Sequence, residues 1–295
     1  MNTVRRILQE TNTMKLIECP RDAMQGLHEF IPTEKKIAYI NHLLKMGYDT
    51  IDFGSFVSPK AIPQMKDTAK VLAGLDLKED SPSLLAIVAN ERGANDASAF
   101  EEIQYLGYPF SVSETFQKRN TGASIEESLI RVEEIQNICV KTGKELVVYL
   151  SMGFGNPYGE PWHPDIVTGW SEKLFRQLDI KIHALSDTIG VSYPDSIRVL
   201  LEQLIQEFPE IEFGSHLHTT PHTWEEKVAE AYHAGCRRMD GAIKGFGGCP
   251  MAKEDLVGNM PSEKMIGWME ENDVNHGINL DLLDEAQIMA SAIMS

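Results

Sequence analysis

Eight short apolar runs alternate with longer helical patterns from one end of the chain to the other. The runs begin near Lys15, Thr50, Leu84, Gln104, Glu145, Lys181, Ile211 and Arg238. Their length and their β-branched and aromatic residues are typical of buried strands. Eight is the number of strands that a closed barrel of alternating strands and helices requires, so this repeat leaves few folds open to the chain.

The segments between the runs carry helix signals. Helical patterns cover residues 33–46, 124–141, 193–208 and 223–234. Ser124 and Glu127 resemble a capping box, and Gly47 and Gly143 are typical helix stops. Because parallel neighbouring strands need a crossover connection, this alternation favours a parallel sheet.

A doubly wound sheet is the main rival to a barrel. It usually has a glycine-rich phosphate-binding turn after its first strand, whereas Pro20-Arg21-Asp22 follow here. The interval of 20 residues between Leu84 and Gln104 leaves the least room for a helix. We therefore predict a single α/β domain, a (β/α)8 TIM barrel over about 15–258. A C-terminal extension over about 259–295 has helical patterns at 262–271 and 281–294 and is predicted to cap the barrel or support a homodimer.

The charge and the cysteines limit the class of protein. A formal net charge of -17 without any basic run argues against nucleic acid as a partner. Four cysteines lie far apart with no CxxC pair, which is typical of a reducing compartment rather than of a disulfide framework. No apolar stretch approaches the ~20 residues of a membrane span, and the first residues lack the apolar core of a signal peptide. We expect a cytoplasmic protein with no membrane partner.

Polar residues gather where the predicted strands end. His216 and His218 lie two apart in IEFGSHLHTT, and side chains two apart on a strand project from the same face. Two imidazoles with a carboxylate from elsewhere suit a catalytic divalent metal. Other strand ends supply Glu18, Arg21, Asp22, Asp52, Ser151, Asp187 and Lys244. In barrels of this kind reactive residues come from the C-terminal ends of several strands, so one active-site face is predicted.

Five motifs then give the chain a family resemblance. They are ECPRDAMQG after the first strand, DFGSFVSPKAIPQM after the second, LSDTIG after the sixth, SHLH after the seventh and GFGGCPMA after the eighth. From about Lys15 to Ala290 the chain resembles the hydroxymethylglutaryl-CoA lyases, metal-dependent barrels with a "DRE"-type first-strand motif. The resemblance implies cleavage of 3-hydroxy-3-methylglutaryl-CoA to acetyl-CoA and acetoacetate. The sequence leaves the pathway open between leucine degradation, ketogenesis and another route.

The resemblance implies a set of metal ligands. Asp22, His216 and His218 would bind one divalent cation, with Asn259 as a fourth ligand through its amide oxygen. Two nitrogens with several oxygens suit Mg²⁺ or Mn²⁺ better than a structural zinc.

The resemblance also implies catalytic roles. Arg21 would stabilise the developing enolate oxygen or the substrate carbonyl. Asp187 is the preferred proton carrier or aligning residue, Asp52 a second candidate, and Glu18 is expected to orient Arg21 or a ligand. Cys249, in the glycine-rich loop GFGGCP, would protonate the departing enolate. The acyl-CoA substrate is a polyanion, and Lys60, Lys244 and Lys253 are candidate contacts for its phosphates.

Four departures from the family pattern leave the acyl group open. Asp52 stands where the lyases usually carry Glu, and Thr219 follows the histidine pair where an acidic residue is usual. Asn259 falls after the stretch AKEDLV instead of before it, and the interval from Glu18 to Arg21 is one residue shorter. A lyase acting on a related 3-hydroxy-acyl-CoA and a Claisen-type synthase of the same superfamily are alternatives. A non-catalytic barrel that binds an acyl-CoA is a more distant one.

Overall fold

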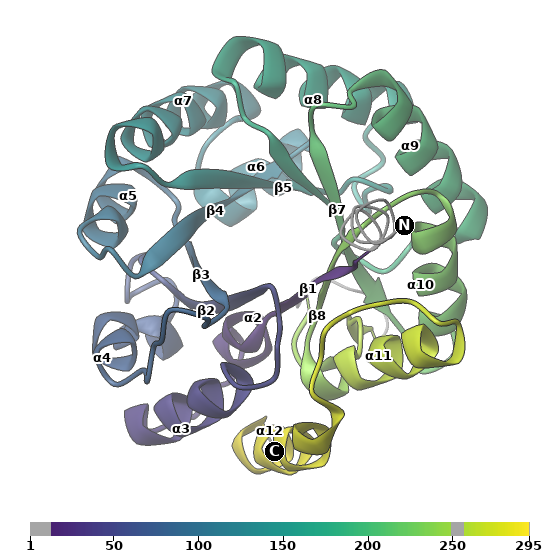
Figure 1. Ribbon diagram of the computed structural model, residues 1–295. Coiled ribbons are helices and arrows are strands. Elements are labelled where there is room, and N and C mark those ends of the chain that lie inside the picture. Colours follow the sequence, from purple (N-terminus) through teal and green to yellow (C-terminus); the bar gives the residue numbers. More distant parts are fainter. Residues whose placement is uncertain (1–12, 249–256, 295) are drawn as a thin grey trace, which may run out of the picture.

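A closed parallel barrel forms the centre of the molecule. The computed structural model describes residues 13–248 and 257–294. Figure 1 shows the strands enclosed by a ring of helices. The barrel strands are β1 (Lys15–Glu18), β2 (Thr50–Ser55), β3 (Ser83–Ile87), β4 (Ile103–Ser111), β5 (Glu145–Ser151), β6 (Ile182–Asp187), β7 (Glu212–Thr219) and β8 (Arg238–Gly241). Each begins within one residue of its predicted start. Neighbours pair in sequence order and β1 closes on β8, so the predicted TIM barrel is confirmed.

Helices follow the strands in the predicted alternation. They are α2 (Pro20–Gln25), α3 (Thr33–Leu43), α4 (Thr68–Ala73), α5 (Glu91–Ser98), α6 (Glu114–Thr121), α7 (Ile125–Thr142), α8 (Pro164–Leu178), α9 (Pro194–Glu207), α10 (Trp224–His233), α11 (Ser262–Glu271) and α12 (Leu283–Met294). Single 3-10 turns occur at η1 (Pro63–Met65), η2 (Ile243–Gly245) and η3 (Leu280–Leu282). None of the helices in the described ranges is long and apolar enough to cross a bilayer.

Local sequence signals set the helix ends. Ser124 accepts a hydrogen bond from the Glu127 backbone N–H while Glu127 bonds back to the Ser124 N–H, so the predicted capping box begins α7. Gly143 ends the same helix in the left-handed conformation, φ 69°, which glycine adopts without steric cost. The short third connection holds α5, whose first turn is capped by the side chain of Asn90.

The alternation of side chains on the strands builds two apolar layers. Leu85, Ile87, Val147, Tyr149, Ile182 and Ala184 form an inner cluster from β3, β5 and β6. Intervening residues such as Leu84, Ala86 and Val148 join the larger cluster between the sheet and the helices. Both faces of the sheet are therefore buried, as parallel sheets require.

The C-terminal segment returns to the barrel through a strand that the sequence did not predict. This strand, β9 (Gly258–Asn259), pairs antiparallel with β7, with Asn259 opposite His218. The chain then forms α11 and, after η3, α12, which lies beside α3 (Figure 1). The extension thus places Asn259 beside His218, at the carboxyl end of the barrel strand β7.

His183 predicts a pH dependence of stability. It is fully buried in β6, where its ring meets the edge of Phe213 at 5.8 Å, and burial lowers its pKa to about 3. In the unfolded chain its pKa is about 6.5, so below that pH only the unfolded state binds a proton here. The free energy of unfolding should fall by about 2 kcal/mol from this group between pH 7.5 and pH 5. In urea unfolding, the free energy of unfolding of His183→Leu should fall less between pH 7.5 and pH 5 than that of the unsubstituted protein. The same fall in both proteins would contradict the role of His183.

Candidate active site

Three predicted metal ligands converge at the carboxyl ends of the strands. Asp22 lies in α2, directly after β1, and His216 and His218 project from the same face of β7. One ligand atom from each lies within 4.8 Å of the other two. The two imidazole ring centres are 5.4 Å apart. Two nitrogens and a carboxylate oxygen at this separation fit a single divalent cation.

Hydrogen bonds at the far side of each ring fix which nitrogen faces the cluster. His216 Nδ1 lies 3.1 Å from Oδ2 of Asp240. His218 Nδ1 lies 3.0 Å from the carbonyl oxygen of Thr188. Both rings therefore have Nε2 left for a cation, with the partner on Nδ1 setting the orientation, as in most metal-binding histidines.

Two of the three ligands are in the protonation state that a metal requires. Burial alone would raise the pKa of Asp22, but Arg21 and His216 hold it at about 2. Burial, with the neighbouring His216, lowers the pKa of His218 to about 4. At neutral pH Asp22 is thus a carboxylate and His218 a neutral imidazole. Burial is the largest single effect and lowers the pKa of His216, but Asp240 and Asp22 together raise it more, so the net shift is upward.

Asn259 joins this cluster from β9. Its amide nitrogen donates to Oδ2 of Asp22 and to the carbonyl oxygen of Phe246, both at 2.8 Å. Two acceptors on one side fix the orientation of the amide, so its oxygen is the atom left for a cation. Thr219, the departure after the histidine pair, donates to the Asn259 carbonyl at 3.3 Å and so binds this return strand.

Arg21 lies beside the cluster in a buried ion-pair network. Its Nε is 3.1 Å from both oxygens of Asp52, and its terminal nitrogens donate to Asp52 and, at 2.7 Å, to Asp22. Burial raises the pKa of Asp52 to about 6 despite the opposing charge of Arg21. Asp52, one methylene shorter than the Glu that the family resemblance implies at this position, engages the guanidinium with both oxygens. Its observed contacts are those of a residue that orients Arg21.

The hydrogen bonds of Glu18 in the described residues go neither to Arg21 nor to the clustered ligands, so its expected role of orienting Arg21 or a ligand stays a prediction. Its oxygens accept from the Ile243 backbone N–H at 2.8 Å and from the Ser262 hydroxyl at 2.5 Å. Burial raises the pKa of Glu18 to about 8. The side chain therefore ties β1 to the end of β8 and to the start of α11.

Asp187 is fully engaged, which argues against the predicted role of proton carrier. It accepts from the backbone N–H groups of Val191 and Ser192 at 2.8 and 3.1 Å and from the Ser192 hydroxyl. Lys227 completes the set at 2.8 Å and also donates to the carbonyl of His218 at the same distance. The alternative expectation, an aligning residue, stays a prediction, and it is supported by Lys227, which links Asp187 to the backbone of His218.

The glycine-rich loop after β8 lies against α2. A Cβ atom on Gly247, which has φ +87°, would lie 2.7 Å from the carbonyl oxygen of Asp22 and 2.9 Å from the amide nitrogen of Asn259. Only glycine fits so close to another backbone with this φ. Cys249 and Lys253 lie outside the described residues.

The two described lysines that were expected at the CoA phosphates are exposed. Lys60 lies in the loop after β2. Lys244 lies in η2 and donates to the Ser291 hydroxyl on α12 at 2.9 Å. Neither makes a contact that identifies it as a phosphate ligand.

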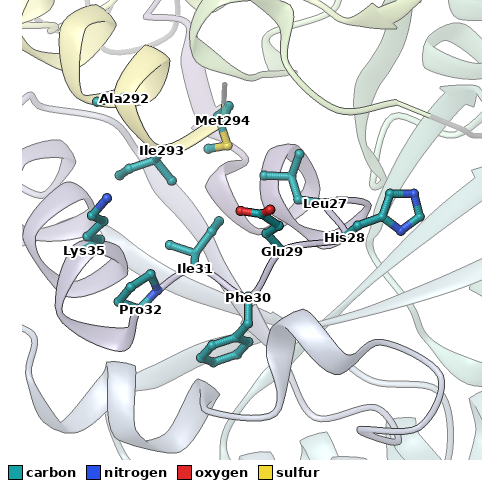
Figure 2. A pocket seen from close by; sticks show the side chains of 10 residues that line it. All are labelled: Leu27, His28, Glu29, Phe30, Ile31, Pro32, Lys35, Ala292, Ile293 and Met294. Carbon is teal, nitrogen blue, oxygen red and sulfur yellow. The ribbon is translucent and has the colours of Figure 1, made fainter.

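A pocket of about 460 Å³ opens beside this face. Figure 2 shows it between the segment that follows α2 and the end of α12. Its lining residues are Leu27, His28, Glu29, Phe30, Ile31, Pro32, Lys35, Ala292, Ile293 and Met294. The segment from Leu27 follows Asp22 by five residues, so the pocket adjoins the helix that carries Arg21 and Asp22.

Sequence reasoning missed the residues that support the site from behind. Asp240 contacts the ring of His216, Thr188 contacts the ring of His218, and Lys227 contacts the backbone of His218. For Asp240 a signal existed, since a carboxylate on the strand next to a His-x-His strand is a common partner for Nδ1. Lys227 lies in the middle of a surface helix and carried no such signal.

Known proteins with a similar sequence and a similar barrel were found by comparison. The family model described as HMGL-like matches residues 15–289. Hydroxymethylglutaryl-CoA lyase YngG of Bacillus subtilis is 34% identical over 264 residues, covering 90% of this chain and 87% of the relative. The solved HMG-CoA lyase of Bacillus subtilis has a TM-score of 0.90 and 32% identity, over 96% of this chain and 94% of that one. An HMG-CoA lyase from Acinetobacter baumannii, in complex with coenzyme A and 3-methylmalate, has a TM-score of 0.88 and 29% identity, over 96% and 92%.

These matches confirm the resemblance that the five motifs indicated. They extend over nearly the whole chain and include the segments that carry Asp22, His216 and His218. The chain belongs to the HMGL-like family, in which its similar relatives are the hydroxymethylglutaryl-CoA lyases, a group of carbon–carbon lyases.

Proposed function

We propose that this protein is a divalent-metal-dependent lyase that cleaves 3-hydroxy-3-methylglutaryl-CoA to acetyl-CoA and acetoacetate. The observation that carries the proposal is the convergence of Asp22, His216 and His218 within 4.8 Å, directly beside the buried Arg21. Membership of a lyase family and the similarity to an HMG-CoA lyase crystallised with coenzyme A support the choice of substrate.

The donor set fits Mg²⁺ or Mn²⁺. Asp22 and the Nε2 atoms of His216 and His218 would supply three ligands, and the amide oxygen of Asn259 would be available as a fourth. A divalent cation held there would lower the pKa of the tertiary hydroxyl of the substrate.

The residues around the cluster fit the cleavage that follows. When the hydroxyl passes its proton to a carboxylate of the site, for which Asp52 stays the candidate, its carbon becomes the ketone of acetoacetate. The breaking C–C bond leaves its electrons on the thioester as an enolate. Arg21, held by Asp52 and Asp22, offers a fixed positive charge to that enolate oxygen. We propose that Cys249 then protonates the enolate carbon, giving acetyl-CoA.

We propose that the pocket beside α2 receives the CoA arm. Apolar side chains of α12 form one wall, and Lys35 supplies a cation at the rim. Lys244 donates a hydrogen bond to Ser291, which is adjacent in sequence to the lining residue Ala292. Lys244 therefore stays a candidate phosphate contact, as do Lys60 and Lys253. A homodimer and a cytoplasmic location likewise stay predictions.

Turnover across a panel of 3-hydroxy-acyl-CoA thioesters tests this function. The hydroxymethylglutaryl thioester should be cleaved fastest, with acetyl-CoA as product, and a faster relative would favour the alternative substrate. Release of free CoA from acetyl-CoA and a 2-oxo acid would identify a Claisen-type synthase instead.

Metal dependence has its own test. Chelation should abolish cleavage and added Mg²⁺ or Mn²⁺ should restore it. A protein that binds CoA but cleaves no thioester with any divalent ion would be a non-catalytic barrel.

Asp240 provides a prediction about metal affinity. Replacing it by alanine removes the group that orients His216, and such supporting carboxylates commonly contribute about 10–100-fold in affinity. Mn²⁺ titration of Asp240→Ala should therefore give a dissociation constant raised by about that factor. Asp67→Ala, which also removes a buried carboxylate but one paired with Lys36, is the control and should bind Mn²⁺ normally. Equal affinities in both variants would contradict this role.

A further inference from the structure

Gln64 holds the wall of the pocket. It lies in η1, in the PQM part of the second-strand motif, and is only 3% exposed. Its side-chain oxygen accepts from the Ile31 backbone N–H at 2.9 Å. Its side-chain nitrogen donates to the backbone carbonyls of Glu29 at 2.8 Å and of Leu27 at 3.3 Å.

The three bonds reach alternate residues of one extended segment. Leu27, Glu29 and Ile31 all line the pocket, as Figure 2 shows. This segment connects α2 to α3 and is not part of either helix. A single side chain from the loop after β2 therefore sets the course of one wall of the pocket.

Gln64 is itself fixed from the other side. Lys36, buried in α3, donates to the Gln64 carbonyl and to Oδ1 of Asp67, the latter at 2.7 Å. Thr33 adds a bond to Oδ2 of Asp67 at 2.8 Å. The backbone of Gln64 is thus held by Lys36. The side-chain nitrogen and oxygen of Gln64 are therefore in position before any ligand binds.

From these contacts we propose that Gln64 is a positioning residue that shapes the pocket wall for the CoA arm of the substrate. The inference rests on the proposed function, which assigns the pocket to that arm. Gln64 lies behind the wall and orients the backbone that the arm would meet. Its loss should weaken recognition of the CoA moiety while the reacting acyl group, held at the metal cluster, is handled as before.

The experiment compares two thioesters of the same acyl group. One is 3-hydroxy-3-methylglutaryl-CoA, and the other is the N-acetylcysteamine thioester, which lacks the pantoate and nucleotide parts of the arm. Gln64→Met keeps the length of the side chain and removes all three hydrogen bonds. For Gln64→Met we expect KM for the CoA thioester to rise about tenfold with kcat within about twofold, and the dissociation constant of free CoA to rise by the same factor. Turnover of the short thioester should equal that of the unsubstituted protein.

Gln117→Met is the matched control. Gln117 is also a buried amide with three hydrogen bonds, to Ser111, Thr121 and Ser128, but it lies in α6 and does not line the pocket. Its loss should lower stability without changing KM for the CoA thioester. Gln64→Glu, which keeps an acceptor for Ile31 but places an oxygen against two carbonyls, should show the same rise in KM and replaces Gln64→Met if that variant does not fold.

The outcomes separate the two proposals. Equal losses with both thioesters, a fall in kcat alone, or no change in CoA affinity would overturn the role of Gln64. Absence of cleavage by the unsubstituted protein would instead defeat the proposed function, while titration with free CoA still reports on the pocket.

Discussion

Replacing His218 by alanine is expected to lower kcat for cleavage of hydroxymethylglutaryl-CoA by about 10³-fold or more. The substitution removes one of the three groups that meet within 4.8 Å and leaves Asp22 and His216 with an incomplete donor set. Because a bound cation supplies several kcal/mol of charge stabilisation in reactions of this kind, its loss affects the chemical step directly. Steady-state kinetics with saturating Mn²⁺, and a parallel Mn²⁺ titration, measure the two effects.

His222→Ala is the control for this prediction. His222 follows His218 by four residues, is exposed and lies outside the cluster, so its loss tests adventitious binding of Mn²⁺ by surface imidazoles. It should leave both kcat and Mn²⁺ affinity unchanged. Activity of His218→Ala within tenfold of the unsubstituted protein would show that the cluster is not the catalytic metal site.

Replacing Cys249 by serine should lower kcat by roughly 10²–10⁴-fold and leave substrate binding largely unchanged. A serine hydroxyl is a far weaker acid than a thiol, so protonation of the enolate slows while the acyl-CoA contacts persist. The comparison of kcat with the dissociation constant of CoA separates the two effects. Cys139→Ser, which alters a buried thiol on α7 far along the chain from the site, should retain full turnover. Near-normal turnover of Cys249→Ser would remove the proposed role of the thiol.

The fold could be predicted because its signals are local. Runs of apolar residues with helix caps between them, such as Ser124 with Glu127, are decided by neighbours in sequence. The return strand β9 was not predictable in this way. It has only two residues, and it forms because Asn259 meets His218, a contact between distant parts of the chain.

The same distinction applies to the site. Asp22, His216 and His218 could be placed on one face because strand ends share that face of the barrel. Their selection as a ligand set came from the family resemblance. The partners of Glu18 and Asp187 could not be named, because Ser262 and Lys227 reach them from helices whose packing the sequence does not state. A polar strand end therefore predicts a place in the active-site face more reliably than it predicts a role there.

The contact between Asp22 and Asn259 also has a consequence for how the proposed metal site forms. Asp22 and Asn259, which share a hydrogen bond, are 237 residues apart in the chain. Their contact needs β1 joined to β8 and the return strand laid on β7, so an incomplete chain on the ribosome cannot assemble it. During refolding, high-affinity Mn²⁺ binding should therefore appear only when the barrel closes. The time at which Mn²⁺ binds would then measure when the native topology forms.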